Sequence, residues 1–534
     1  MKIHSIDYFM KTSFYFKLIA CTFLFCIRMF AGKNEVYSQS INFNGLYSDS
    51  SFSSSFTSTI EMNTKMYSVG VVSSISGSGK KGYFIATDKF GNPLFKKKFK
   101  SPDTGYNSIA FSDLVQGGDY FYITGTLYKL DTTRERGYTV DPIVLKYDTL
   151  GNLIWYKSLD ISSRYFYDLP KITYHLGRIR IVSSIVFEGP FLFDIKFRNI
   201  YLVFDTNGNF LDSEIYWNFG NYPFEFITDN IPLENGKMIL TGFRSFSKPQ
   251  YRDNGLVFKV DSLGRTIWQK YYGDTAIKHH LISAVKLKDG NVLACGYKAR
   301  ITDSTGLNKH YDAWLVKLNP INGDTIWTKT VKSFYYSSAS MIFELNSGDL
   351  ILAGGKVEVG RYDPVAEIMR TDHQGNLLWT KRYIWGTDSI ALKTTFETVY
   401  SIIQTENGGL VLSGNAQGIN PIVQQSGWLL KLDSNGCLVA GCGSVGIVEY
   451  EVFSSLTFKA YPNPAQDRVQ LAGELQDGDV VTLYDFTGKI LHQQVINSSE
   501  IPEIAVSEYA NGIYLLSLYR SGYNKATQKL VIAR

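Results

Sequence analysis

The sequence predicts an all-β protein, a seven-bladed β-propeller followed by a small C-terminal β-sandwich. Three observations carry this prediction. Aromatic residues make up 15% of the 534 residues and charged residues only 19%, against about 25% in typical globular proteins. The chain has 46 Gly against 14 Pro, which favours glycine turns between strands. A strand-turn-strand pattern recurs seven times, and a segment of different character follows it.

The predicted parts are a signal peptide over 1–38, the propeller over 39–443, a linker over 444–455 and a C-terminal domain over 456–534. The formal charge of +5 is small and comes from 54 basic and 49 acidic residues spread along the chain. It therefore does not predict nucleic-acid binding. We expect no transmembrane segment in the mature chain.

The amino terminus has the pattern of a secretory signal peptide. Basic residues precede an apolar run from Leu18 to Ile27 that is too short to span a bilayer. The best small-residue cleavage pattern places the cut between Ser38 and Gln39. An alternative is a lipid anchor on Cys21 after Leu18-Ile19-Ala20, but Lys17 would leave that signal almost no apolar stretch.

The recurring pattern is an apolar run, an Asp or Asn, a short turn with Gly and, in most copies, an aromatic residue on the next strand. These polar positions lie 53 to 61 residues apart, a period typical of propellers. They are Asp88, Asp148, Asp205, Asp261, Asn319, Asp372 and Asp433. Further apolar strands lie upstream of each turn, and several of them end at Gly, as at Gly125, Gly242, Gly296, Gly354 and Gly414. Each repeat therefore predicts four antiparallel strands, which form one blade.

The Asp and Gly residues that recur in these turns have a local explanation. Asp caps its own turn through its side chain, and Gly adopts the positive φ that the hairpin requires. The aromatic residue is expected to pack on a neighbouring sheet. Calcium binding is the rival interpretation of sequences such as Asp205-Thr206-Asn207-Gly208, but the full ligand series and its final Glu are missing.

Ring closure is predicted to use both ends of the propeller sequence. The seventh repeat stops early, and the stretch from Ser38 to Tyr47 precedes the first blade, so it can supply the missing outer strand. Two repeats lack the aromatic residue and carry Asp212 and Ala440 instead. A count of six or eight blades therefore stays open.

The Asp-x-x-Gly hairpin followed by Trp, as at Asp148, Gly151 and Trp155, resembles the repeat of quinoprotein-like (PQQ-like) propellers over roughly residues 60 to 440. The resemblance implies architecture only, because no adjacent cysteine pair of the quinoprotein dehydrogenases occurs here. We expect no bound cofactor.

Three cysteines remain after removal of the signal peptide. Cys437 and Cys442 are close in sequence, and export to an oxidising compartment favours a disulfide between them, with two unpaired thiols as the alternative. Cys295 lies in an apolar strand pattern and is expected to be a buried small hydrophobic residue.

Four blocks near the carboxy terminus resemble the type A C-terminal sorting domain of the type IX (Por) secretion system. They contain Tyr461-Pro462-Asn463-Pro464, then Asp485, Gly488 and Lys489, then Gly512 and Tyr514, and finally Lys529 in the last six residues. The resemblance implies a β-sandwich recognised by the type IX secretion machinery and removed by its sortase. The protein would then be secreted or placed on the cell surface, outside the outer membrane, after passage through the periplasm. The alternative is a generic immunoglobulin-like binding domain, and the alternation over Val480–Tyr484 fits either sandwich.

The search for catalytic motifs finds none. No histidine pair has zinc-protease spacing, no nucleophile elbow occurs, and we interpret His279 and His280 as a pair on a blade surface. We therefore predict no catalytic residue and no metal site. The expected function of the propeller is a non-catalytic scaffold that binds a glycan or a protein, and the alternative is an extracellular enzyme that acts on polysaccharide.

Overall fold

The computed structural model describes 42–47, 52–74, 79–101, 106–130, 138–159, 165–166, 170–188, 195–217, 224–245, 253–274, 277–301, 309–331, 336–337, 339–357, 365–384, 396–417, 425–438, 450–452, 458–473, 475–485, 490–497, 502–520 and 523–534. Several predicted features lie outside these residues. They are the signal peptide with its cleavage site at Ser38 and Gln39, together with Cys442, Gly488 and Lys489.

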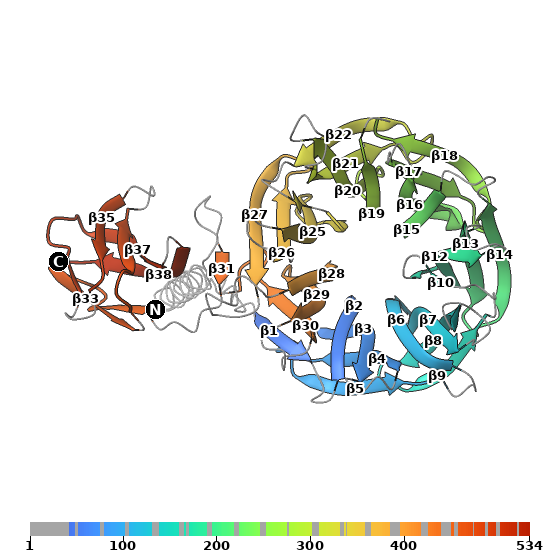
Figure 1. Cartoon of the computed structure of the whole chain (residues 1–534), viewed down its shortest axis with the longest axis horizontal. Coiled ribbons are helices and arrows are strands. Elements are labelled where there is room, and N and C mark those ends of the chain that lie inside the picture. The colour runs from blue at the N-terminus through green and yellow to red at the C-terminus, as the bar shows by residue number, and fades with distance from the viewer. Residues whose placement is uncertain are drawn as a thin grey trace, which may run out of the picture. The chain divides into compact units, whose positions relative to one another are not determined.

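The described part of the chain is almost entirely β-strand, with one short 3-10 helix, η1 (Glu234–Gly236). From residue 52 onward, successive groups of antiparallel strands surround a central opening and form a ring (Figure 1). This arrangement is a β-propeller.

Each group runs from an inner strand to an outer strand. The groups are β2 (Phe52–Met62), β3 (Lys65–Ser74), β4 (Lys80–Thr87), β5 (Pro93–Phe99); β6 (Tyr106–Gly117), β7 (Tyr120–Leu130), β8 (Tyr138–Asp148), β9 (Leu153–Ser158); β11 (Lys171–His175), β12 (Arg178–Glu188), β13 (Ile195–Asp205), β14 (Phe210–Trp217); β15 (Phe224–Pro232), β16 (Met238–Ser245), β17 (Asp253–Val260), β18 (Thr266–Tyr272); β19 (His279–Lys286), β20 (Val292–Ile301), β21 (Lys309–Leu318), β22 (Thr325–Val331); β24 (Met341–Glu344), β25 (Leu350–Val357), β26 (Val365–Thr371), β27 (Leu377–Ile384); and β28 (Phe396–Gln404), β29 (Leu410–Gln417), β30 (Ser426–Leu432). Short strands add to these sheets: β10 (Tyr165–Phe166) on β12, β23 (Tyr336–Ser337) between β21 and β25, and β31 (Tyr450–Val452) beside β27.

The amino-terminal strand β1 (Phe43–Tyr47) closes the ring. It pairs antiparallel with β30 and becomes the outer strand of the last group, which confirms the predicted closure. Trp428 donates its indole N–H to Asn44 Oδ1 at 2.6 Å, and Asn42 donates to the carbonyl of Cys437 at 3.0 Å. The two ends of the propeller sequence are thus joined in one sheet.

The repeated turns behave as predicted. Asp88 Oδ1 accepts hydrogen bonds from the backbone of Phe90 and Asn92, and Gly91 has a φ of 86°. Asp148, Asp205, Asp372 and Asp433 accept the same two bonds in their own turns. The carboxylates therefore serve the turn itself.

The aromatic residue of one repeat lies on the turn glycine of the next. A Cβ on Gly208 would be 3.0 Å from the Trp155 ring, and one on Gly323 would be 2.9 Å from the Trp268 ring. The same relation joins Phe95 to Gly151, Trp327 to Gly375 and Trp379 to Gly436. The last repeat lacks its own aromatic residue, and Phe43 of β1 takes that place against Gly91.

The glycines predicted to end the second strand of several groups lie inside these strands instead, as Gly242 does in β16 and Gly414 in β29. A second repeated feature explains them. On the inner strands β2, β6, β15, β19 and β28, the pairing shifts by one residue directly after the residue that faces such a glycine. At this bulge the inner backbone approaches closely. A Cβ on Gly242 would lie 1.7 Å from the Phe226 carbonyl oxygen, and one on Gly414 would lie 1.8 Å from that of Thr398.

The bulged residue links neighbouring groups where it carries a hydroxyl. Thr57 donates to the carbonyl of Phe111 on the next inner strand at 3.1 Å. Ser112 donates to the carbonyl of Pro170 at 2.6 Å, and Thr228 bonds the carbonyl of Leu281. These bonds hold adjacent inner strands at a fixed spacing around the opening.

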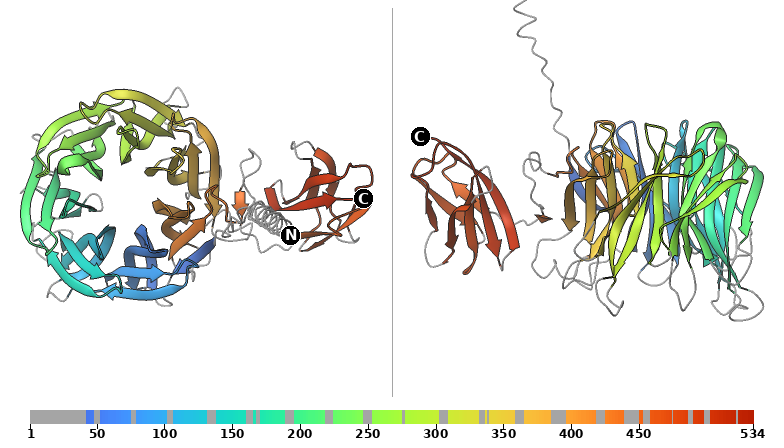
Figure 2. Two further views of the ribbon diagram at one scale, coloured as in Figure 1. Left: turned by 180° about the vertical axis from the view of Figure 1, so that it is seen from behind. Right: turned by 90° about the horizontal axis from the view of Figure 1, so that it is seen from above.

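The C-terminal residues form two sheets around their own hydrophobic core. One sheet has the order β32 (Phe458–Tyr461), β33 (Arg468–Gly473), β36 (Glu503–Ala505). The other has the order β35 (Ile490–Val495), β34 (Val480–Tyr484), β37 (Gly512–Arg520), β38 (Tyr523–Ile532). Val469 of the first sheet and Leu483, Leu516 and Leu530 of the second are all buried in this core. Figure 2 shows the two sheets from two further directions.

Candidate functional site

The motif Tyr461-Pro462-Asn463-Pro464 holds the last strand of the chain. Asn463 Nδ2 donates to the carbonyl of Lys529 at 2.7 Å, and Asn463 Oδ1 accepts from the backbone N–H of Val531 at 2.9 Å. The amide side chain thus replaces a strand partner along β38. Its neighbour Ala465 continues the contact, with hydrogen bonds to Val531 and Ala533.

The terminal residue Arg534 is anchored to the same region. Its guanidinium donates to the carbonyl oxygens of Gln466 at 3.1 Å, Val506 at 2.9 Å and Tyr509 at 2.8 Å. Its backbone N–H donates to Asn511 Oδ1 at 3.2 Å. Arg534 is therefore fixed by several loops and is more than a charge in solvent.

The block that begins with Gly512 adds a buried tyrosine beside this anchor. Tyr514 is 9% exposed and donates to the carbonyl of Ala510 at 2.7 Å. Its ring centroid lies 6.1 Å from that of Tyr509. Tyr514 therefore shapes the loop whose Tyr509 carbonyl binds Arg534, whereas Lys529 points its side chain toward solvent.

Strand register brings the motif blocks to one end of the module. Tyr484 on β34 pairs with Leu515 on β37, so Asp485 follows β34 at the end where β37 begins. Gly512 pairs with Ile532 on β38, which places the chain terminus at the same end. Asp485 is half-buried there. The opposite end is fixed by Arg520, which forms two hydrogen bonds with the fully buried carboxylate of Asp479.

A chain of three hydrogen-bonded side chains lies between two neighbouring groups of the ring. His280 Nε2 is 2.6 Å from Asp253 Oδ2, and His280 Nδ1 is 2.8 Å from Tyr297 Oη. The carboxylate can only accept, so Nε2 carries the proton and Nδ1 accepts from the tyrosine. The His280 ring also stacks on Phe243 with centroids 3.7 Å apart.

The surroundings set the charges of this chain. Burial lowers the pKa of His280 despite its bond to Asp253, so the imidazole is neutral at pH 7. Burial raises the pKa of Asp253, but hydrogen bonds from His280 and Ser245 and the charge of Lys278 outweigh it and lower that pKa overall. The interpretation of His279 and His280 as a surface pair was wrong, because His279 is 1% exposed and lies against Trp314. The sequence around His279 predicts a strand, but it does not show whether the side chain is covered by residues distant in sequence such as Trp314.

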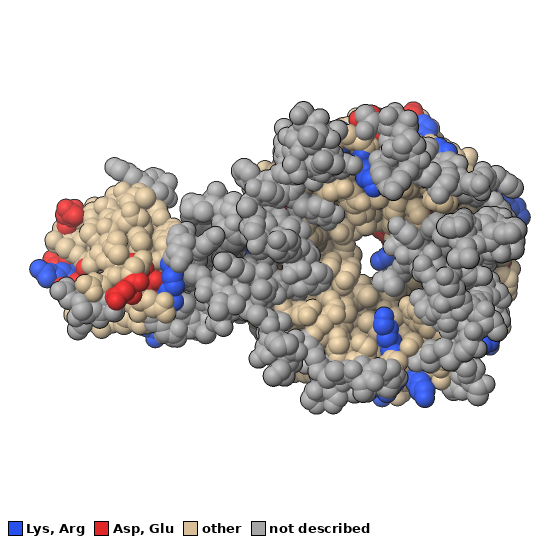
Figure 3. All heavy atoms as spheres, viewed as in Figure 1, with Lys and Arg blue, Asp and Glu red and all other residues tan. Residues whose placement is uncertain are grey.

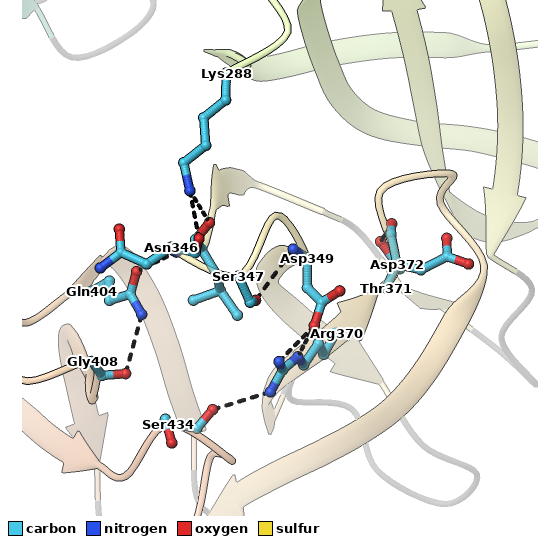
Figure 4. A network of polar contacts seen from close by, with 11 residues as sticks. Lys288, Asn346, Ser347, Asp349, Arg370, Thr371, Asp372, Gln404, Gly408 and Ser434 are labelled. Atoms are coloured by element: carbon cyan, nitrogen blue, oxygen red, sulfur yellow. Dashed lines mark hydrogen bonds and ion pairs between the residues drawn. The ribbon is translucent and has the colours of Figure 1, made fainter.

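The inner turns near the opening form a second polar network (Figure 4). Lys288 Nζ donates to the carbonyls of Leu345 and Asn346, each at 2.8 Å, and Asn346 donates its backbone N–H to Gln404 at 3.0 Å. A cavity of about 380 Å³ lies beside it, lined by Ile60, Glu61, Asn346, Ile403, Gln404, Thr405 and Glu406. On the face that Figure 3 shows, some Lys or Arg atoms lie at the opening among described residues of other kinds. In each of these turns the fourth residue is Gly, and its N–H donates to the carbonyl of the first residue, as in Leu287–Gly290 and Leu345–Gly348. This second repeat is present in the sequence, but it was not identified from the sequence alone.

The described residues include two cysteines, Cys295 and Cys437. Cys437 is buried and bonded in a disulfide, and its predicted partner Cys442 lies outside the described residues. Cys295 is a free and buried thiol, as expected, and burial raises its pKa well above the usual range. No group of three or more potential metal ligands occurs among the described residues.

Residues 459–533 match the family model described as the secretion system C-terminal sorting domain. This module is a C-terminal sorting domain. The sorting domain supports export by the type IX secretion machinery to the cell surface or beyond it. In the described part of the chain, no helix has the length and apolar character needed to cross a membrane.

Solved structures similar to this chain include a β-propeller domain and two enzymes. The propeller domain of the Trilobed protease from Pyrococcus furiosus is 9% identical, with a TM-score of 0.39 over 70% of this chain and 93% of that one. An α-L-arabinanase from Penicillium chrysogenum is 10% identical, with a TM-score of 0.39 over 60% of this chain and 92% of that one. An α-L-arabinofuranosidase from Fusarium graminearum is 8% identical, with a TM-score of 0.37 over 73% and 97%. No curated protein matches the sequence significantly.

Proposed function

We propose that this protein is a cargo of the type IX secretion system, whose sorting domain is read at the end where its motif blocks meet. The observation that carries the proposal is the match over 459–533. At that end Asn463 is hydrogen-bonded to Lys529 and Val531, and Asn511 is hydrogen-bonded to Arg534. A signal peptide cut between Ser38 and Gln39 would deliver the chain to the periplasm. The secretion machinery and its sortase would then act on the sorting domain.

The motif residues divide into two roles in this proposal. Asn463 and Tyr514 shape the end, because they bind within the module, and Gly512 contributes backbone pairing opposite Ile532. Tyr461 and Lys529 present exposed side chains and are the residues that a partner would contact. Pro462 and Pro464 flank Asn463, and Asp485 directly follows β34. Gly488 and Lys489 stay predicted members of the motif outside the described residues. The sandwich itself is proposed to be immunoglobulin-like.

For the ring, we propose a closed seven-bladed propeller that acts as a non-catalytic scaffold for a glycan or a protein. The strand groups and the closing strand β1 support this count, since seven groups of four strands then account for the ring. The abundance of aromatic residues, with 36 Tyr and 34 Phe, supports a binding surface. A quinoprotein-like type of propeller stays a prediction.

The alternative function is an extracellular enzyme that acts on polysaccharide, and one observation favours it. The hydrogen bonds from Asp253 through His280 to Tyr297 orient a tyrosine hydroxyl. In enzymes with a side-chain nucleophile, a histidine positioned by a carboxylate orients the nucleophile in a similar way. The two functions are separated by incubating the purified mature protein with a panel of polysaccharides. Binding without released sugar supports the scaffold, whereas turnover that is lost in His280→Phe establishes the enzyme.

A further inference from the structure

The strand β35 is an edge of the sorting domain that has little cover among the described residues. It is the first strand in the order β35-β34-β37-β38, and among the described residues it pairs only with β34. Its sequence Ile490–Val495 contains no charged residue and no proline. Ile490 is 53% exposed and Val495 is 63% exposed. Natural proteins usually protect such edges with charges, proline, a bulge or a covering segment, because an open edge pairs readily with another strand. On β35 the register shifts once, at Leu491, and the residues from His492 to Val495 pair regularly with β34.

The other edge of the same sheet is protected. Asn463 and Ala465 supply hydrogen bonds along β38 at its end, and an exposed lysine, Lys529, lies on that strand. Along the free side of β35, Tyr509 Oη donates a hydrogen bond to the carbonyl of Leu491 at 3.3 Å. Among the described residues, one edge of the sheet is thus covered at its end by the chain itself, and the other edge is largely open.

The open edge is continuous with the sorting motif. Ile490 comes directly after Lys489 in sequence and pairs opposite Tyr484, which precedes Asp485. Val495 lies at the other end of the strand and pairs opposite Val480, next to the buried pair of Asp479 and Arg520. One end of the edge strand therefore pairs next to the motif residue Asp485, and the other end pairs next to the Asp479–Arg520 ion pair.

We infer that β35 is the docking edge on which an extended segment of a type IX machinery protein adds as a further strand. The partner segment would supply backbone hydrogen bonds, with uncharged and β-branched or aliphatic side chains opposite Ile490 and Val495. This inference rests on the proposed function of the sorting domain and adds the place and mode of contact. A second copy of this chain is the competing occupant.

The test places a photo-crosslinking residue, p-benzoylphenylalanine, at position 495 of the full-length chain in the native host. The matched control carries it at position 150, where Leu150 is 71% exposed on a turn of the ring. The expected result is a crosslink from position 495 to a type IX machinery protein and none from position 150. A crosslink to a second copy of the chain, or none from position 495, overturns the inference.

Charge substitutions give an independent readout. The double variant Ile490→Lys, Val495→Lys should lower the exported amount at least about tenfold, because lysines on an edge block strand addition. The double variant Ile490→Thr, Val495→Thr keeps strand propensity without charge and should be exported normally. Thermal unfolding of both purified variants shows that the domain remains folded. If the lysine variant is exported normally and deletion of 456–534 abolishes export, the inference that β35 is the docking edge is overturned, and the sorting function still holds. Normal export of the deletion itself removes the proposed function.

Discussion

At the scale of single residues, the ring depends on glycines that face a neighbouring backbone. The substitution Gly242→Ala would bring a Cβ within 1.7 Å of the Phe226 carbonyl oxygen. Because backbone cannot move aside as a flexible side chain can, we expect a loss of about 1–3 kcal/mol or more in the free energy of unfolding. Chemical denaturation of the purified protein measures this loss.

The matched control is Gly512→Ala in the sorting domain, where the nearest atom would be 3.6 Å away, at ordinary contact distance. This variant should unfold within about 0.5 kcal/mol of the parent protein. Equal stability of Gly242→Ala and the parent would show that the bulge is not the reason for the glycine.

Asn463 is the residue that the sorting domain most directly needs for its shape. Asn463→Ala removes two hydrogen bonds to β38, and at about 0.5–1.5 kcal/mol for each bond we expect about 1–3 kcal/mol of destabilisation of the domain. The exported amount should fall with it. In Gln466→Ala the backbone carbonyl that binds Arg534 is retained, so domain stability and export should match the parent. Both are measured by thermal unfolding and by the amount of protein outside the cell.

The buried His279 predicts a pH dependence of ring stability. Burial lowers its pKa, so the unfolded chain, with an ordinary pKa of about 6.5, takes up the proton more readily. Stability is therefore complete above about pH 6.5 and declines as the pH falls below it. The melting temperature should fall between pH 7.5 and pH 5.5, and the fall should be smaller in His279→Phe. An unchanged fall in that variant would assign the effect to other groups.

At the scale of elements, β1 does two tasks in one sheet. It pairs along β30, and it supplies Phe43 and Tyr47 where the last repeat has no aromatic residue of its own. Tyr47 Oη also donates to the carbonyl of Gly91 at 2.7 Å in the first repeat. The closing strand therefore connects the last group of strands to the first.

Deletion of residues 42–47 should lower the melting temperature of the ring and expose β30 to proteolysis. Without β1, β30 loses one of its two neighbouring strands and becomes the edge of its sheet. Tyr47→Phe loses a single hydrogen bond and should cost only about 1 kcal/mol. Limited proteolysis followed by mass spectrometry locates the opened region. A deletion variant that melts and resists protease like the parent would mean that the ring closes without β1.

The sequence was sufficient for some of these elements and insufficient for others, for physical reasons. Turn chemistry is local, so the roles of Asp88 and Gly91 follow from neighbouring residues. The residue that replaces the missing aromatic of the last repeat is far from it in sequence. Phe43 could be placed against Gly91 only from the pairing of β1 with β30. Likewise, β37 lies between β34 and β38 while β36 belongs to the other sheet, so the meeting of Asn463, Asn511 and Arg534 is not visible in the chain order.

At the scale of the whole molecule, the ring and the sorting domain are built for separate tasks. Each has its own hydrophobic core among the described residues, and the ring closes with its own terminal strand. Removal of the sorting domain should therefore leave the ring folded, with an unchanged melting temperature. A ring that fails to fold without residues 456–534 would contradict this independence.

Export of the full-length chain and of a chain that ends at residue 455, compared in the native host, tests the central claim most directly. The account predicts that the full-length protein reaches the cell surface or the medium without its sorting domain, as the intact mass of the mature form would show. The shortened chain should accumulate, folded, in the periplasm. Equal export of both chains, with residues 456–534 retained in the mature full-length form, would contradict the account.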